Sequence, residues 1–249
     1  MSQPSSSLGG MTDFTLGGLD ELMAESSWAT GSLVGFDLET TGTDPFEDRI
    51  VTAALVGSVS RTWLVDPGVE IPEGAAAVHG VTTERARAEG APAAEALAEI
   101  AAELSAAVAA GTPVVVYRAG FDLTMLACEL RRHGLAEPDW DAMVVLDPYV
   151  LDKETDRYRK GKRTLTDVTA VYDIPLQRAH SADGDAGAAV ELCRAIGRRH
   201  PRVGGMEATA LHAAQVRWHA ADAEGLERFF RSKGREESVD RRWPLRLGD

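Results

Sequence analysis

Two carboxylates at alternate positions of one apolar run constrain this chain more than any other feature. The run extends from Leu33 to Glu39, and its acids are Asp37 and Glu39. Successive side chains of a β-strand point to opposite faces, so this pair shares one face with Cα atoms roughly 6.6 Å apart. Unpaired acids on a buried face are costly or shift their pKa values upward, whereas Mg²⁺ and Mn²⁺ prefer carboxylate oxygens. The pair therefore predicts a divalent-metal platform, and an exposed acidic strand end is the alternative.

The order of apolar patterns predicts an α/β fold. We expect three initial strands to form an antiparallel meander and the later, alternating helices and strands to complete a mixed sheet with helices packed on it. The expected strands are 33–39, 50–57, 62–65, 114–117 and 143–146. The expected helices are 93–109, 121–133, 164–172, 181–196 and 206–232, with a loop over 78–82.

The chain divides into three predicted parts. Residues 1–30 are rich in Ser, Gly and acidic side chains, which is typical of a flexible tail. Residues 31–203 form the expected catalytic-size domain. Residues 204–249 contribute a C-terminal helix and tail, and we expect the helix to pack back on the domain.

The charge of the chain limits its partners. The net charge of −13 argues against tight, indiscriminate binding to duplex nucleic acid. Five cations nevertheless gather within seven positions, at Arg157, Arg159, Lys160, Lys162 and Arg163. This cluster is either a patch that steers phosphates or an ordinary solvated loop.

The remaining composition indicates a reduced, non-membrane protein. The two cysteines, Cys128 and Cys193, lie in apolar helix-like surroundings without zinc-site spacing. No apolar run approaches the ~20 residues that span a bilayer, and no signal-peptide pattern is present. We therefore expect a cytoplasmic protein.

Three further residues are candidates for chemistry. Asp122 closely follows the strand at 114–117, although an ordinary acid at a helix N-terminus explains it too. His180 and Asp185 would not converge on one continuous helix. If Ser181 caps the helix, His180 lies in the preceding loop and Asp185 in the first turns, so both can face one cleft.

In this order, the acids and the histidine resemble the DEDDh exonucleases. The first motif of that family matches Phe36–Gly42, the second matches Ala119–Asp122 and the third matches His180–Ala186. The histidine-glycine loop of the family matches Val78–Thr82. The resemblance covers about residues 32–200, and the most similar kind of relative is the epsilon proofreading subunit of bacterial replicative polymerases, with its stand-alone relatives.

The resemblance implies a ribonuclease-H-like fold and removal of nucleoside monophosphates from the 3′ end of DNA or RNA. In-line hydrolysis of this kind uses two cations ~4 Å apart, here Mg²⁺ or Mn²⁺. By the same resemblance, Asp37 bridges the cations, Glu39 and Asp185 hold the one that carries the attacking water, and Asp122 serves the other. His180 takes the proton of the water, for which its near-neutral pKa is suited.

The resemblance also implies a pocket for the terminal nucleotide. Thr40 and the neighbouring backbone hold that nucleotide, while Val78, His79 and Phe121 line the pocket. The family commonly has His-Asn before its second motif, where this chain has Tyr117-Arg118. Arg118 is therefore a candidate to pair with a substrate phosphate or to reshape the pocket.

The implied partners are a nucleic acid with a single-stranded 3′ end and a polymerase or other replication or repair protein. Two other functions stay open. One is a non-catalytic module that binds nucleic-acid ends or a polymerase. The other is a phosphohydrolase with Asp37 as covalent nucleophile, but such enzymes want a second Asp where Glu39 stands.

Overall fold

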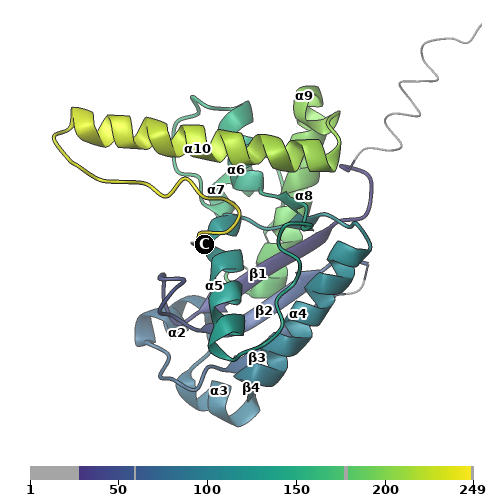
Figure 1. The fold of residues 1–249 in the computed structure, drawn as a ribbon, viewed down its shortest axis with the longest axis vertical. Helices are drawn as coiled ribbons and strands as arrows, with labels where there is room; N and C mark the ends of the chain where they lie inside the picture. Colours follow the sequence, from purple (N-terminus) through teal and green to yellow (C-terminus); the bar gives the residue numbers. More distant parts are fainter. Residues whose placement is uncertain (1–27, 59, 177–178, 248–249) are drawn as a thin grey trace, which may run out of the picture.

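A mixed β-sheet forms the centre of the molecule (Figure 1). The computed structural model describes residues 28–58, 60–176 and 179–247, so almost all of the predicted tail over 1–30 lies outside the described residues. The strand order is β4-β3-β2-β1-β5-β6. The strands are β1 (Val34–Thr40), β2 (Ile50–Val56), β3 (Arg61–Asp66), β4 (Ala91–Pro92), β5 (Val114–Val115) and β6 (Val145–Leu146).

The first three strands form the antiparallel meander expected from the sequence, while β5 pairs with β1 and β6 in parallel. Helices cover the sheet, which confirms the ribonuclease-H-like α/β class. The helices in the described part of the chain are α2 (Glu73–His79), α3 (Thr83–Glu89), α4 (Ala93–Ala109), α5 (Ala119–Arg132), α6 (Pro148–Thr155), α7 (Leu165–Val171), α8 (Ala182–Arg199), α9 (Pro201–Gly204) and α10 (Ala208–Ser232).

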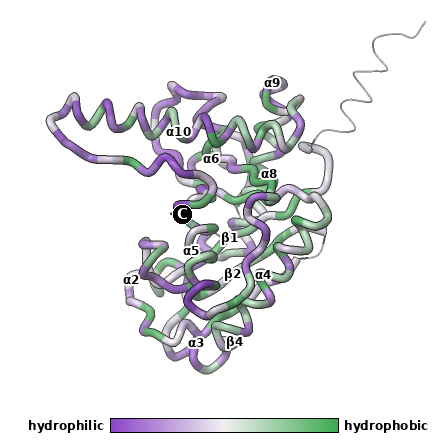
Figure 2. Tube along the Cα trace, in the orientation of Figure 1, coloured by the Kyte–Doolittle hydropathy of each residue, from purple (hydrophilic) through white to green (hydrophobic). Residues whose placement is uncertain are grey.

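The two faces of the sheet are packed by different helices. Apolar residues of α4 and α5 form one core cluster with Phe36 and Leu38 of β1. On the other face, α8 contributes Ala189 and Cys193 to a second cluster, together with Val115 of β5. Figure 2 shows hydrophobic residues concentrated in the sheet and the helices that cover it. The alternation along β1 thus places Phe36 and Leu38 on the α4–α5 side and leaves the intervening residues toward α8.

The prediction of a loop over Val78–Thr82 is confirmed for residues 80–82 and is wrong for Val78 and His79. Val78 and His79 end α2, and Gly80 caps that helix in the left-handed conformation at φ 74°, with its N–H bonded to the carbonyl of Ala76. Thr82 then caps α3 by accepting a hydrogen bond from the N–H of Arg85. Gly80 therefore caps the C-terminus of α2, and Thr82 caps the N-terminus of α3.

The C-terminal part of the chain packs back on the sheet, as expected for residues 206–232. Trp243 is only 6% exposed and belongs to the α4–α5 core cluster. Its ring lies 5.2 Å from that of His212 on α10, and its Nε1 donates to Asp147 Oδ2 at 3.3 Å. The backbone N–H of Arg246 donates to Thr124 of α5 at 3.0 Å. The segment after α10 therefore closes the core beside α5.

Both cysteines carry free thiols; Cys193 is buried and Cys128 is half-buried. No helix in the described ranges is long and apolar enough to cross a membrane.

Gly35 sets the distance between β1 and α8. A Cβ at this position would overlap the carbonyl oxygen of Ala186 and lie 2.8 Å from Cγ2 of Val190. We expect Gly35→Ala to lower the free energy of unfolding by about 1–3 kcal/mol, because α8 must shift. Urea unfolding followed by circular dichroism measures this change.

Gly187→Ala is the matched control on α8. A Cβ there meets only Cγ1 of Val56, at 3.9 Å, and alanine favours the helix. Equal stability of the Gly35→Ala variant and this control would show that the close approach is unimportant.

Candidate active site

The end of β1 presents two carboxylates toward α8. Phe36 and Leu38 are buried against α4 and α5, so Asp37 and Glu39 lie on the opposite face of the strand. Both acids are half-buried. Gly35 lies two residues before Asp37 on the same face, where the missing Cβ admits the backbone of α8.

The first turn of α5 adds a third carboxylate. Asp122 is 4% exposed, and its Oδ1 accepts a hydrogen bond from the N–H of Leu38 at 3.1 Å. β5 pairs only with Val34 and Gly35 of β1, so the N–H of Leu38 lies beyond the end of that neighbouring strand. Asp122 thus occupies the place that a longer β5 would fill.

The start of α8 adds the fourth carboxylate and the histidine. His180 lies in the turn before the helix at φ 62°, and its N–H donates to Asp185 Oδ2 at 3.3 Å. Ser181 is the N-cap residue, as predicted, but its side chain makes no capping hydrogen bond. One ligand atom each from Glu39, His180 and Asp185 lies within 4.8 Å of the others. The structure therefore brings these three groups together, with Asp37 and Asp122 beside them.

Burial raises the pKa of each of the four acids, and repulsion from a neighbouring carboxylate adds to it. Burial raises the pKa of Asp37 well above its ordinary value, and the nearby carboxylates of Asp122, Asp185 and Glu39 raise it further. Burial and then Asp185 raise the pKa of Glu39 to about 7. Burial likewise raises the pKa values of Asp122 and Asp185.

One carboxylate oxygen of this cluster has no partner among the described residues. Oδ1 of Asp185 is buried and forms no hydrogen bond with any residue that the structure describes. A buried acceptor without a donor is costly. Together with the raised pKa values, this oxygen indicates that the cluster holds either protons or a cation.

Three predicted substrate residues lie around the end of β1. Thr40 is half-buried, and its hydroxyl donates to the carbonyl of Gly42 at 2.6 Å. Nδ1 of His79 accepts a hydrogen bond from the N–H of Val81. Burial lowers the pKa of His79, and the backbone carbonyl of Thr40 partly opposes that shift. Val78 is 53% exposed at the end of α2. His79 therefore lies beside the backbone of Thr40, the residue that follows Glu39.

Phe121 and Arg118 flank the start of α5. Phe121 precedes Asp122 and is half-buried against the core. Arg118 has a left-handed backbone at φ 62°, and its guanidinium lies 4.6 Å from the ring centre of Tyr149. The structure therefore places Arg118 on an aromatic ring at the turn between β5 and α5.

The basic cluster at 157–163 is mainly structural. Asp152 is fully buried and forms ion pairs with Arg159 and Arg163, while Arg157 pairs with Glu154. An uncompensated buried carboxylate is costly, so two of the five cations compensate Asp152 rather than steer phosphates. Both predicted interpretations, a phosphate patch and a solvated loop, fail for those two arginines.

Asp147 is the residue that sequence reasoning missed. It is 1% exposed and accepts hydrogen bonds from the N–H groups of Arg118, Ala119 and Tyr149. It therefore fixes the turn that starts α5 and the start of α6. The signal in the sequence is Asp147-Pro148 after an apolar run, because Asp at the N-cap followed by Pro marks a helix start.

Comparisons with known proteins agree with this fold. E. coli exonuclease I in complex with a dT13 oligonucleotide is 20% identical with a TM-score of 0.59, over 70% of this chain and 42% of that one. Exonuclease I from Methylocaldum szegediense is 23% identical with a TM-score of 0.59, over 80% and 45%. At such identities the likeness concerns the fold, and the chain spans less than half the length of these proteins.

No match to the chain was found among curated protein sequences. A family model described as Exonuclease (RNase T) matches residues 34–193, from the start of β1 into α8. That range contains the four carboxylates and His180. The chain therefore belongs to the exonuclease family.

Proposed function

We propose that this protein is a metal-dependent 3′–5′ exonuclease of the DEDDh type. It hydrolyses the phosphodiester bond at the 3′ end of single-stranded DNA or RNA and releases nucleoside 5′-monophosphates. The observation that carries the proposal is the convergence of Glu39, His180 and Asp185 within 4.8 Å, with Asp37 and Asp122 beside them.

The donor set suits two divalent cations, Mg²⁺ or Mn²⁺. Asp37, Glu39, Asp122 and Asp185 offer the hard carboxylate oxygens that these ions prefer, and Oδ1 of Asp185 has no other described partner. When bound, such cations supply charge stabilisation to the phosphate and lower the pKa of a water molecule.

His180 accepts the proton of the attacking water in this proposal. Its side chain belongs to an exposed residue, so solvent and substrate reach it, and a ring nitrogen lies within 4.8 Å of the ligand oxygens of Glu39 and Asp185. The hydrogen bond from its N–H to Asp185 holds the turn in place. An imidazole at this position can accept a proton from a water molecule held by the carboxylates.

The terminal nucleotide occupies the surface around the end of β1. Thr40 and His79 supply polar contacts, and Val78 and Phe121 supply apolar ones. Arg118 is exposed and has no ion pair among the described residues, so it is free to meet a phosphate of the strand.

Similar proteins support the proposed substrate and partners. Exonuclease I of E. coli was crystallised with dT13, which supports a single strand as the substrate here. A further exonuclease I structure is a complex with SSB-Ct. It is 18% identical with a TM-score of 0.59, and the match covers 79% of this chain and 46% of that one. The resemblance to the epsilon subunit supports a polymerase or another replication or repair protein as a partner.

Single strands labelled at the 5′ end test the proposal. Stepwise shortening in Mg²⁺ or Mn²⁺ supports the exonuclease. Binding without shortening supports the alternative, a non-catalytic module that holds nucleic-acid ends.

Asp37→Ala is expected to slow cleavage about 1000-fold or more, because several kcal/mol of charge stabilisation is lost with the cations. It also removes a buried like charge, so the metal-free protein stays folded. Cleavage assays and thermal melts with and without Mg²⁺ measure both effects. Undiminished cleavage would exclude Asp37 as a metal ligand.

His180→Ala is expected to slow cleavage about 10²- to 10⁴-fold, the usual contribution of a general base. The stabilisation of the fold by Mg²⁺ should persist, because the four carboxylates remain. The shape of the pH–rate profile should also change, because a general base has been removed. An unchanged rate and profile would remove His180 from the reaction.

The metal-free protein is expected to lose stability as pH rises from about 4.5 to about 7. The pKa of Glu39 is about 7 in the folded chain against an ordinary value of 4.5, so the folded state binds more protons across this window. Urea unfolding in chelator over this range measures the slope, which Glu39→Gln should reduce. Saturating Mg²⁺ should also reduce it by binding the carboxylate form; a slope unaffected by either change contradicts the prediction.

A further inference from the structure

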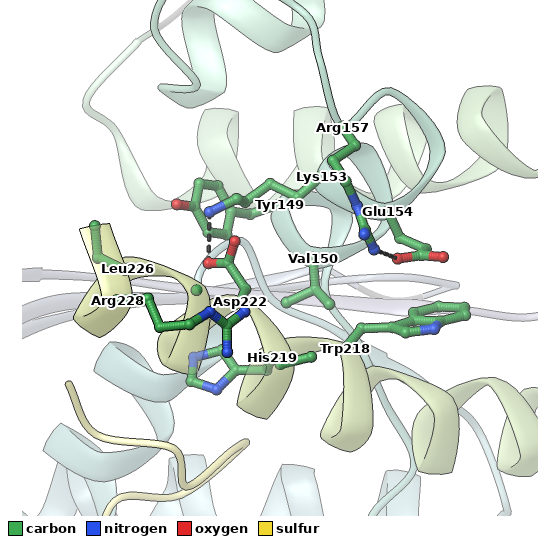
Figure 3. Close-up of a pocket in the computed structure, with 12 residues that line it drawn as sticks. Tyr149, Val150, Lys153, Glu154, Arg157, Trp218, His219, Asp222, Leu226 and Arg228 are labelled. Carbon is green, nitrogen blue, oxygen red and sulfur yellow. Dashed lines mark hydrogen bonds and ion pairs between the residues drawn. The ribbon is translucent and has the colours of Figure 1, made fainter. Parts of the chain in front are cut away.

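A pocket of about 450 Å³ lies between α6 and α10 (Figure 3). Its aromatic walls are Tyr149 from α6 and Trp218 and His219 from α10. Such a volume suits a small ligand or one unit of a polymer. The pocket lies outside the cluster of carboxylates described above.

Cations outnumber acids among the residues that line this pocket. The cations are Lys153, Arg157 and Arg228 and the acids are Glu154 and Asp222, in a chain whose net charge is −13. Arg157 pairs with Glu154, and Arg228 pairs with Glu224 of α10. Lys153 bonds Asp222 at 2.5 Å while its Nζ lies 5.3 Å from the ring centre of Tyr149. Aromatic faces beside cations are the combination that binds single-stranded nucleic acid.

Arg118 and Tyr149 connect this pocket with the candidate active site. The guanidinium of Arg118 lies 4.6 Å from the ring centre of Tyr149, and that ring packs against Tyr117 at 6.0 Å. Asp122 lies one helical turn beyond Arg118, roughly 6 Å along the axis of α5. Asp147 holds both sides of the connection, since it accepts the N–H groups of Arg118 and Tyr149.

The backbone of Arg118 also points to a functional position. Its φ of 62° is unfavourable for a residue with a side chain, and the hydrogen bond to Asp147 holds it there. Strained residues of this kind gather at binding and catalytic sites. Arg118 is therefore an exposed cation in a strained conformation, and it lies between the carboxylates and the pocket.

We propose that the pocket between α6 and α10 is a second subsite for the substrate strand, an inference that rests on the proposed exonuclease function. With the 3′-terminal nucleotide at the carboxylates, the strand passes Arg118. A nucleotide nearer its 5′ end stacks on Tyr149 and Trp218, and its phosphate meets Lys153. The subsite selects single strands, because stacking on protein rings needs unpaired bases.

Substrates of two lengths test this subsite. A dinucleotide reaches only the carboxylates, whereas a longer single strand also reaches the pocket. We expect Tyr149→Ala and Lys153→Gln to lower kcat/KM for the longer strand about fivefold or more, the lower limit for losing one stacked base. Lys153→Gln should leave kcat/KM for the dinucleotide unchanged, whereas Tyr149→Ala should lower it less than for the longer strand, because Arg118 rests on that ring. Tyr149→Phe should resemble the wild type, because it keeps the ring.

Two further variants separate local charge from general effects. Asp222→Asn releases Lys153 from its ion pair and should tighten binding of the longer strand. Arg131→Gln removes a cation from a comparable pair with Glu137, roughly 20 Å along α5 from Arg118, and should change nothing. Equal effects of Lys153→Gln and Arg131→Gln would overturn the subsite, as would equal losses for both substrate lengths.

Binding of a labelled strand, followed by fluorescence anisotropy, separates failure of the subsite from failure of the exonuclease. If the wild type cleaves neither substrate, the proposed function fails. Weaker binding by Tyr149→Ala and Lys153→Gln, with Arg131→Gln unaffected, would then still support the subsite. Unchanged binding in all three variants would overturn it.

Discussion

Repulsion among four carboxylates at the end of β1 is the constraint on which the rest of the structure depends. Asp37 is surrounded by Asp122, Glu39 and Asp185, and burial and these neighbours together raise its pKa. Ionised carboxylates are stable in such a buried cluster only if a positive charge lies beside them. The neighbouring elements hold the acids there nonetheless: the missing side chain of Gly35 admits α8, and the N–H of Leu38 holds Asp122.

Local patterns in the sequence predict the fold class, whereas the convergence of the four acids with His180 is implied by the resemblance to the DEDDh exonucleases. The alternation along β1 separates Phe36 and Leu38 from the acids, and the order of strands and helices specifies the mixed sheet. The position of His180 before α8 follows from the helix start at Ser181.

Other features depend on partners that are distant in the sequence. Arg159 and Arg163 look like surface cations until the burial of Asp152 is known. The importance of Asp147 arises from bonds to Arg118 and Ala119, almost thirty residues earlier. The loop expected at Val78 and His79 is wrong for a different reason, since the Gly and Thr that follow them cap two helices, and capping residues and loop residues are the same amino acids.

The contact between Trp243 and Asp147 has a consequence for the timing of maturation. The two residues are 96 positions apart, and a growing chain acquires its indole only after every carboxylate of the site has been synthesised. Asp147 also holds the turn at which α5 begins, so Trp243 stabilises a segment made much earlier, the one that carries Asp122. Formation of the carboxylate cluster is thereby tied to the synthesis of Trp243, well after Asp185.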